Sequence, residues 1–383
     1  MKKLKVLLAT PGSWHLPQTA AALLNRDALA GIWTTDRIKN AALISYWRRC
    51  LPFQMAMMPF YFVAPQIVVE KVFYASFPLW KSWVRRAPLP ESHVVHGIMG
   101  FCTELFDKAE KVGALKVVDC QNSHPTSYYG YWQRECDLWC PGERVPIPRW
   151  MFARMNRELE MADVILCPSL FVRDSMILNG IPQEKCFLNP FGVNTDVFRP
   201  RKKVPAKPRF VSVGTICLRK GHQYLFRAFE LVKEELPDAE LIVVGEYKKD
   251  FHLEKPKWEG SFTHLTKVSH PDLADLLQTC TAFVFPSLEE GFARVIPEAM
   301  AAGLPIIASY ESGATTLVCD GVEGIIVRPR DPRHIADAMI RVATNMELNK
   351  GMGEAAHSKG AVANSWQDYG DRLLDEYGKR LEA

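Results

Sequence analysis

Short runs of apolar residues alternate with longer stretches of helical periodicity along most of this chain. We expect the runs to form strands at residues 4–10, 94–95, 115–120, 164–167, 210–214, 241–245, 282–286, 306–309 and 325–327. Most of these runs are continuous in Val, Ile and Leu, which is typical of parallel strands covered on both faces. The pattern therefore predicts an α/β fold. Two doubly wound, Rossmann-like domains would face a central cleft, and ligands would bind beyond the carboxyl ends of the strands.

The organisation of the chain follows from a change in composition near its middle. Residues 199–208 are rich in proline and basic side chains and have no periodicity, which favours a solvated linker. We therefore expect a first domain over 1–198 and a second over 209–364. Residues 365–383 are expected to include an amphipathic helix that packs back across the first domain.

The segment 50–69 breaks the strand–helix pattern because it carries no charged residue. Its length suits a membrane-spanning helix, but Pro52, Pro59 and Pro65 argue against one regular span. Two interpretations stay open at this point. The segment either forms core helices of the first domain, or it belongs to an aromatic, basic-edged surface within 45–86 that contacts the inner face of a membrane.

Composition narrows the class of protein. The 383 residues suffice for two full cores, and a net charge of only +4 gives no support to nucleic-acid binding. The ten cysteines are scattered and form no Cys-x-x-Cys pair, which favours a reducing, cytoplasmic compartment. The first apolar run is short and stops at Pro11–Gly12, so it is interpreted as a buried strand rather than a signal peptide.

The segment 283–305 carries the clearest chemistry. A buried strand ends at a Pro-Ser turn, a glycine-bearing loop follows, and a helix opens after Pro297. Glu290 and Glu298 bracket the loop, and the backbone N–H groups of residues 291–294 lie between them. Carboxylates accept hydrogen bonds from hydroxyl groups, whereas free N–H groups and a helix N-terminus attract phosphate. The arrangement suits a polyhydroxylated ligand with an anionic group.

The same residues, with Ala299, Met300, Ala301, Gly303 and Pro305, resemble the GT-B glycosyltransferases. The resemblance is to the retaining class called glycosyltransferase family four, or glycosyl transferases group 1. It implies that Glu290 binds hydroxyls of the donor sugar and that Glu298 binds the ribose hydroxyls of the nucleotide. It also implies that the backbone of four residues cradles the sugar and diphosphate: Gly291, Phe292, Ala293 and Arg294. Glycine is usual in the family where this chain has Ala293.

A second matching segment spans residues 211–221. By the resemblance, a strand ends at Gly214 and Lys220 places its charge on the diphosphate leaving group. The family usually has arginine directly after this glycine, but the chain has Thr215. Arg219 either supplies the missing charge or is a solvated surface residue. A weaker third element, with Thr266 and Val268, implies a loop whose backbone meets the nucleotide base.

The first domain matches the family in fewer places. Gly12 and Ser13 follow the first strand, in a loop that touches the sugar and phosphates in the family. His124 resembles the family histidine near the reacting centre. His15 and His96 are weaker candidates, because a lone histidine after a strand is more often structural.

The resemblance implies transfer of a hexosyl-type sugar from a nucleotide-diphospho-sugar to a hydroxyl of a sugar, lipid-linked or other acceptor. Retention at the anomeric carbon and a place in glycan, polysaccharide or glycolipid biosynthesis follow from it too. No Asp-x-Asp motif occurs, so we expect catalysis without metal or cofactor, with charge supplied by Lys220, Arg219 and a helix N-terminus. The absence of a P-loop and of Gly-x-Gly-x-x-Gly after a strand argues against an ATPase and a dehydrogenase. A nucleotide-sugar epimerase and a non-catalytic nucleotide-sugar-binding protein remain alternatives.

Overall fold

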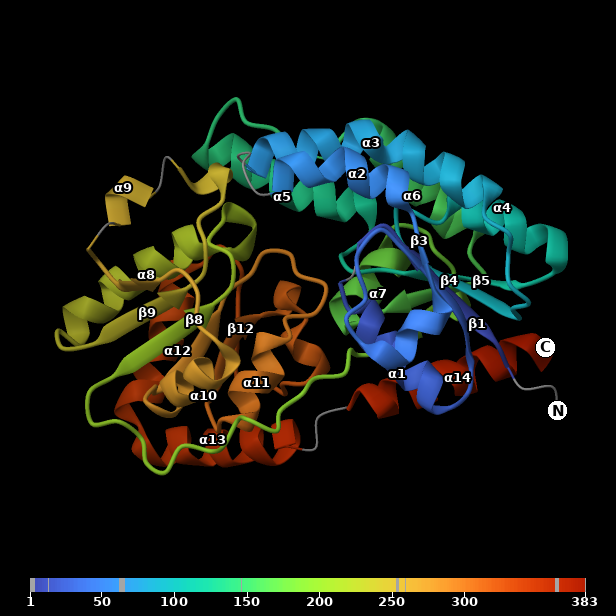
Figure 1. Cartoon of the computed structure of the whole chain (residues 1–383). Coiled ribbons are helices and arrows are strands. Elements are labelled where there is room, and N and C mark those ends of the chain that lie inside the picture. The colour runs from blue at the N-terminus through green and yellow to red at the C-terminus, as the bar shows by residue number, and fades with distance from the viewer. Residues whose placement is uncertain are drawn as a thin grey trace.

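The computed structural model describes residues 4–12, 14–61, 66–145, 147–252, 255–258, 260–361 and 365–382. Two parallel sheets organise these residues (Figure 1). The seven-stranded sheet has the order β3-β2-β1-β4-β5-β6-β7, and the six-stranded sheet has the order β10-β9-β8-β11-β12-β13. In both sheets the strand order reverses beside the first strand, as in doubly wound folds. The predicted α/β class with two Rossmann-like domains is confirmed.

The strands of the first sheet are β1 (Val6–Thr10), β2 (Leu29–Thr34), β3 (Trp47–Arg49), β4 (Val94–Ile98), β5 (Leu115–Asp119), β6 (Val164–Cys167) and β7 (Cys186–Leu188). Those of the second are β8 (Arg209–Val213), β9 (Glu240–Val244), β10 (Thr263–Leu265), β11 (Ala282–Phe285), β12 (Ile306–Ser309) and β13 (Gly324–Val327). All nine predicted strands are present. The sequence patterns missed β2, β3, β7 and β10, and the last three of these are three-residue strands at sheet edges that lack a buried apolar run.

The first domain contains the helices α1 (Leu16–Asn25), α2 (Leu51–Tyr61), α3 (Gln66–Arg86), α4 (Thr103–Val112), α5 (Pro125–Trp139), α6 (Arg149–Met161) and α7 (Leu170–Leu178). The second contains α8 (His222–Glu235), α9 (Lys255–Trp258), α10 (His270–Gln278), α11 (Val295–Ala301), α12 (Pro332–Thr344) and α13 (Met346–Ala361). Short 3₁₀ turns lie at Ala41–Tyr46, Gln183–Lys185, Leu218–Lys220, Lys249–Phe251, Tyr310–Ser312 and Ala314–Thr316.

The last helix, α14 (Trp366–Glu382), lies beside α1 at the base of the first domain (Figure 1). Tyr369, Leu373 and Tyr377 are buried in the core below the first sheet. Arg26 of α1 donates to Asp371 of α14 at 2.6 Å and 2.7 Å. The chain therefore returns to the first domain after completing the second. The exact domain boundaries stay a prediction.

Helix α5 ties the two domains together. Cys136 and Cys140 near its C-terminus are buried in the core of the second domain. Its Glu135 accepts hydrogen bonds from Gln223, Tyr224 and Arg330, all residues of the second domain, at 2.7–2.9 Å. Because a buried carboxylate is stable only when its oxygens are bonded, this network fixes the two domains relative to each other.

The uncharged segment 50–69 falls on α2 and the start of α3, with residues 62–65 outside the described part. Phe53 and Met57 are buried in the core of the first domain. Leu51, Met55 and Met58 follow helical spacing on another face and are exposed, Met55 to 70%. No described helix has an apolar stretch that would reach across a bilayer. The core-helix interpretation thus explains one face of α2 and leaves the other unexplained.

Candidate active site

The loops after β8, β10 and β11 bring the predicted donor-binding residues to one edge of the second sheet. β8 lies between β9 and β11, where the strand order reverses, so its loop and that of β11 flank the switch point. Ligands of doubly wound folds bind in this crevice, beyond the carboxyl ends of the strands.

Lys220 and Glu290 meet directly at this crevice. Lys220 Nζ lies 3.3 Å from Glu290 Oε2, and Arg219 Nη1 lies 3.5 Å from the same oxygen. Burial raises the pKa of the Glu290 carboxyl, but the charges of Lys220 and Arg219 outweigh burial and hold the pKa below its usual range. Glu290 is therefore ionised at neutral pH and able to accept hydrogen bonds from hydroxyl groups.

Glu289 is a charged residue of this site that the sequence analysis missed. Its carboxylate is fully buried and accepts from Arg219 at 2.9 Å. It also accepts from the N–H and the hydroxyl of Ser123, in the first domain, at 2.9 Å and 3.1 Å. Arg219 is only 17% exposed, so the interpretation as a solvated surface residue is wrong. The only sequence signal was the pair of adjacent glutamates, of which the resemblance used one.

Gly214 permits the close packing of the loop after β8. Its φ is +147°, and an added Cβ would lie 3.1 Å from Lys220 Nζ. The neighbouring Gly245 approaches the Gly214 carbonyl so closely that a Cβ there would lie 2.0 Å from the oxygen. A side chain on Gly214 would press on the Lys220 ammonium group, and one on Gly245 would displace the Gly214 carbonyl. Thr215 lies half-buried in the same loop.

Glu298 lies in the first turn of α11, beside the loop after β10. His270 Nε2, at the start of α10, is 3.5 Å from Glu298 Oε1. Burial raises the pKa of Glu298, although His270 and Arg294 oppose the shift. Thr266 is exposed and Val268 half-buried in the loop that precedes α10. The structure thus brings these two predicted residues near Glu298, and it adds His270, which the sequence analysis did not select.

The loop 290–294 touches the first domain. An added Cβ on Gly291 would lie 1.8 Å from the Gln121 carbonyl oxygen, so only glycine fits. The Phe292 ring packs against Phe191 with centroids 5.8 Å apart, and Ala293 is buried in the second domain. No hydrogen bond to another described residue engages the backbone N–H groups of 291–294. Arg294 is exposed. The backbone here can serve as a set of donors for an anionic ligand.

On the opposite side of the crevice, Gly12 lies just after β1. A Cβ at Gly12 would approach the Trp14 ring to 2.9 Å, so the glycine lets this ring fold against the loop. Ser13 lies outside the described residues. Both Trp14 and the segment 121–124 lie beyond the carboxyl ends of strands in the first sheet.

His124 precedes α5 and caps its N-terminus. Its Nδ1 accepts from the Thr126 N–H at 3.3 Å, and its own N–H donates to Ser175 Oγ at 2.9 Å. Burial lowers the pKa of the ring. A neutral ring whose Nδ1 accepts carries its hydrogen on Nε2. His124 is thus arranged to donate a hydrogen bond to a ligand oxygen.

The two weaker histidine candidates are held inside the first domain. His15 Nε2 and His96 Nε2 lie 2.7 Å and 3.2 Å from the same Asp119 oxygen. His96 Nδ1 pairs with the Tyr377 hydroxyl at 2.9 Å, and His15 Nδ1 lies 3.3 Å from Gln121 Nε2. Since both nitrogens of each ring are engaged, the structural interpretation is favoured for both.

Solved structures with the same architecture define the class of fold. The chain superimposes on sucrose-phosphate synthase from Thermosynechococcus elongatus with a TM-score of 0.73 and 17% identity, over 98% of both chains. It superimposes on Anabaena HepE in complex with UDP-glucose with a TM-score of 0.68 and 14% identity, over 98% of this chain and 100% of that one. At these identities the likeness concerns the fold alone, which is the GT-B fold.

The second domain also resembles known proteins in sequence. Residues 194–359 match the model described as "Glycosyl transferases group 1". The D-inositol 3-phosphate glycosyltransferase 1 of Catenulispora acidiphila is 28% identical over 265 residues, which are 63% of this chain and 63% of that protein. The chain thus spans less than two thirds of this relative's length. The resemblance to group 1 glycosyl transferases is confirmed, and it is carried by the second domain.

Proposed function

We propose that the protein transfers a sugar from a nucleotide-diphospho-sugar to an acceptor hydroxyl. The observation that carries this proposal is the contact of Lys220 with Glu290, at 3.3 Å, in the crevice at the switch point of the second sheet. A group that binds phosphate and a group that binds hydroxyls lie side by side there, which matches a sugar joined to a diphosphate.

Each site residue has a role in this proposal. Lys220 and the backbone N–H groups of 291–294 hold the diphosphate, and Glu290 accepts hydrogen bonds from the donor sugar. Glu298 accepts from the ribose, and His124 donates from Nε2 across the crevice. Arg219 is bonded to Glu289 and Glu290, so it positions these carboxylates while its charge also offsets the diphosphate. We place the base beside Thr266 and Val268.

The reaction breaks the bond between the anomeric carbon and the phosphate oxygen and forms a bond to the acceptor oxygen. The acceptor proton passes to the departing phosphate oxygen on the same face, so the configuration is retained. Support comes from the ion pairs of the two glutamates, Glu290 with Arg219 and Lys220 and Glu289 with Arg219, because a carboxylate paired with a cation is a weak nucleophile. The positive charge of Lys220 supports catalysis without a metal.

We also propose that the exposed face of α2 rests on a membrane at the cytoplasmic side. Leu51, Met55 and Met58 supply the apolar stripe. Exposed basic residues flank it, with Arg48 before α2 and Lys71, Arg85 and Arg86 on α3. A lipid-linked acceptor of glycan or glycolipid synthesis would be reached from this face. Vesicles with anionic lipids should retain the protein at low salt, and the substitution Met55→Glu should abolish retention. A protein that stays in the supernatant at low salt would contradict the membrane contact.

The transfer itself is tested first by thermal unfolding with UDP, GDP, ADP and TDP. UDP is the first choice because HepE was solved with UDP-glucose. A binding nucleotide stabilises the folded protein by mass action, so one base should raise the midpoint above the others. The matching nucleotide sugar is then incubated with and without acceptors. Acceptor-dependent release of the nucleotide diphosphate supports transfer, whereas a free isomerised sugar without acceptor supports an epimerase. Stabilisation by none of the nucleotides would contradict the proposal.

A further inference from the structure

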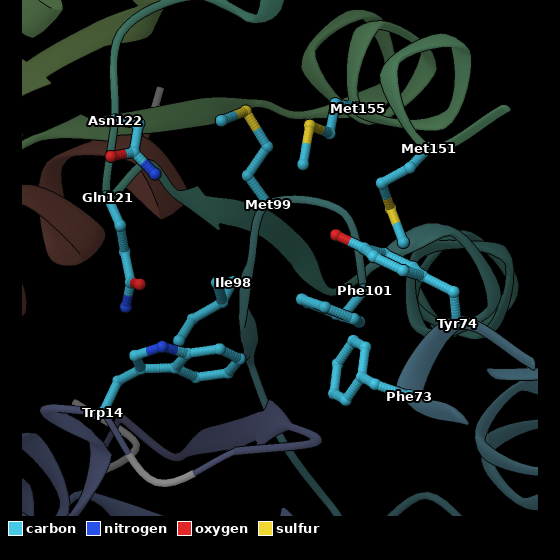
Figure 2. Close-up of a pocket in the computed structure, with 10 residues that line it drawn as sticks. All are labelled: Trp14, Phe73, Tyr74, Ile98, Met99, Phe101, Gln121, Asn122, Met151 and Met155. Atoms are coloured by element: carbon cyan, nitrogen blue, oxygen red, sulfur yellow. The ribbon is translucent and has the colours of Figure 1, made fainter. Parts of the chain in front are cut away.

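A pocket of about 210 Å³ lies in the first domain, beside the crevice (Figure 2). Eight of the ten residues that line it have mainly apolar side chains: Trp14, Phe73, Tyr74, Ile98, Met99, Phe101, Met151 and Met155. Polar groups, which include the Tyr74 hydroxyl and the amides of Gln121 and Asn122, still form a substantial share of the wall. In Figure 2, Gln121 and Asn122 lie at one end, opposite Phe73, Tyr74 and Met151. We call the end at Gln121 and Asn122 the polar end, and the opposite end, where the Tyr74 hydroxyl is the polar group drawn, the apolar end.

The polar end of the pocket adjoins the loop 290–294 of the second domain. The Gln121 carbonyl oxygen packs against Gly291, and Ser123, next to Asn122, bonds Glu289. A molecule that fills the pocket and extends past Gln121 and Asn122 would thus present its polar group between Glu290 and His124. This is where a hydroxyl must lie to receive the sugar.

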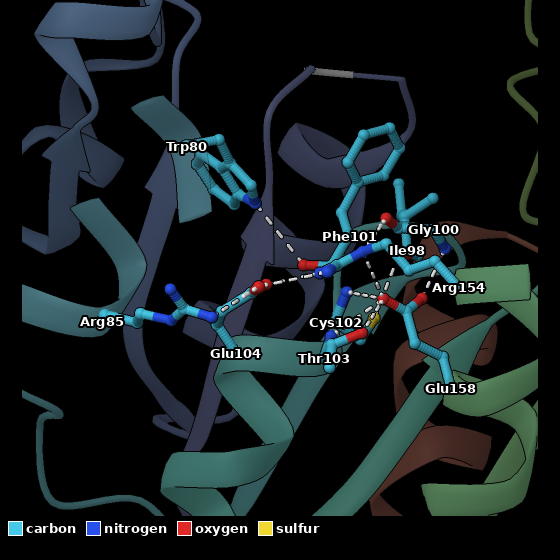
Figure 3. Close-up of polar contacts among 10 residues, drawn as sticks. All are labelled: Trp80, Arg85, Ile98, Gly100, Phe101, Cys102, Thr103, Glu104, Arg154 and Glu158. Atoms are coloured by element: carbon cyan, nitrogen blue, oxygen red, sulfur yellow. Dashed lines mark hydrogen bonds and ion pairs between the residues drawn. The ribbon is translucent and has the colours of Figure 1, made fainter. Parts of the chain in front are cut away.

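The apolar end is held by a network of buried polar groups (Figure 3). The Glu158 carboxylate accepts from the N–H groups of Gly100, Cys102 and Thr103 at 2.5–2.8 Å. Arg154, on the same helix, donates to the Gly100 carbonyl at 2.7 Å and pairs with Glu104. Helix α6 thereby clamps the loop 98–103 with one set of side chains, and the same helix contributes Met151 and Met155 to the pocket. The backbone of this part of the wall is therefore held in place before a ligand binds, which lowers the entropic cost of binding.

We propose that this pocket binds the aliphatic chain of an amphipathic acceptor whose polar head carries the reacting hydroxyl. The inference rests on the proposed glycosyl transfer and names the class of acceptor. A cavity of about 150 Å³ lined by apolar side chains holds benzene, so this pocket accommodates a short segment of alkyl or isoprenyl chain. Methionine side chains adapt to flexible chains of varied shape. Phe73 and Tyr74 belong to α3, which packs along α2, so the pocket lies beneath the helix pair with the exposed apolar face.

The test uses the full chain with UDP present and measures calorimetric binding of ethyl, butyl, hexyl and octyl β-D-glucosides below their micellar concentrations. We expect affinity to rise about fourfold for each added methylene until the pocket is full. Met155→Gln should weaken octyl glucoside binding at least tenfold, whereas Met155→Leu should leave it near the wild-type value. Met58→Gln, on the exposed face of α2, is the matched control and should also leave it unchanged.

The outcomes separate this inference from the proposed function. Stabilisation by UDP in every variant shows that each is folded and that the donor side is intact. Affinity that does not depend on chain length, or that falls in Met58→Gln rather than in Met155→Gln, would overturn the pocket assignment. A wild-type protein that UDP and the other nucleotides fail to stabilise would overturn the transfer proposal, while the alkyl series would still report on the pocket.

Discussion

The two sides of the crevice are built in opposite ways. On the side of the second domain, two cations and two glutamates lie in short loops, and ion pairs within 3.5 Å link Lys220, Arg219, Glu289 and Glu290. On the side of the first domain, mainly aromatic and methionine side chains line a pocket that has two amide side chains at one end. One side is suited to a charged, hydroxyl-rich ligand and the other to an apolar one.

This difference in composition indicates that the two sides of the site have different tasks. Ion pairs and bonded backbone fix positions to fractions of an ångström, which suits a diphosphate whose departure must be stabilised. Methionine-rich walls adapt their shape, which suits a chain that must be held but not activated. The contact between Gly291 and Gln121 joins the two sides, so the charged loop and the polar end of the pocket have to move together.

The largest effect is expected on the charged side, at Lys220. Lys220→Ala removes the cation proposed to stabilise the leaving diphosphate, and removal of one such group typically costs about 10²–10³-fold in turnover. Release of nucleotide diphosphate from the matching donor measures it. Lys207→Ala is the matched control, because Lys207 forms its ion pair with Glu240 at the surface of the second domain. Equal rates in both variants would remove Lys220 from the mechanism.

The next largest effect is expected at Glu289, which links the second domain to Ser123 of the first domain. Glu289→Ala leaves Arg219 with one carboxylate partner and removes both bonds to Ser123, so we expect a loss of about 3 kcal/mol in the free energy of unfolding. Denaturant titration measures this loss. Glu240→Ala is a matched control, since Glu240 also pairs with two cations but is partly exposed and should cost only about 0.5 kcal/mol. Similar losses in the two variants would show that Glu289 is not a structural bridge.

The sequence grouped several residues of the charged side, although not Glu289 or His270, and indicated almost nothing of the apolar side. Glu290, Glu298 and the four loop residues are close in the chain, so their spacing carries the information. The pocket is assembled from five separate segments, at 14, 73–74, 98–101, 121–122 and 151–155. Four of them contribute one to three largely apolar residues each, which look like ordinary core positions, and 121–122 contributes two amides. No spacing within the sequence distinguishes a methionine that lines a pocket from one that fills a core.

The same distinction holds for the fold. Continuous Val, Ile and Leu runs identified every strand with buried neighbours on both sides except β2, whose sequence Leu-Ala-Gly-Ile-Trp-Thr contains small residues in place of a β-branched run. The edge strands β3, β7 and β10 owe their conformation to hydrogen bonds with a neighbouring strand, which depend on tertiary structure. The sequence did not indicate that α5 links the two domains, for a related reason. Its Glu135 is a buried partner of residues far along the chain.

Gly291→Ala should disturb the contact that couples the two sides. The added methyl group would lie 1.8 Å from the Gln121 carbonyl, which cannot move without displacing the polar end of the pocket. We expect a cost of about 1–3 kcal/mol, visible as roughly tenfold or greater loss in kcat/KM together with weaker binding of octyl glucoside. Gly130→Ala in α5 is the control, because a Cβ there meets nothing within 4 Å. Loss of donor affinity with unchanged octyl glucoside binding would show that the sides are independent.

The smallest effect is a pH dependence confined to the charged side. Burial raises the pKa of Glu298 above its ordinary value of 4.5, so the protonated form persists into a range where an exposed glutamate is ionised. For the ligand-free protein, this group's contribution to stability is therefore greatest below 4.5 and declines as the pH rises through the raised pKa. We expect nucleotide binding to have the opposite dependence, because the ionised carboxylate is the better acceptor for the two ribose hydroxyls that we propose it binds. We expect affinity for the nucleotide diphosphate to fall a few-fold as the pH drops from neutral towards 4.5.

Two variants identify Glu298 as the source of this dependence. Glu298→Gln should bind the nucleotide weakly at every pH and lose the Glu298 component of the profile. His270→Ala removes the neighbour that opposes the shift at 3.5 Å, so the pKa of Glu298 should rise further and affinity should begin to fall at a higher pH. Calorimetric titrations across this range measure both profiles. Binding of octyl glucoside should stay constant over the same range, because no ionisable group with a pKa there lines the pocket. A parallel loss of both ligands would mean that acid loosens the whole crevice rather than titrating one carboxyl.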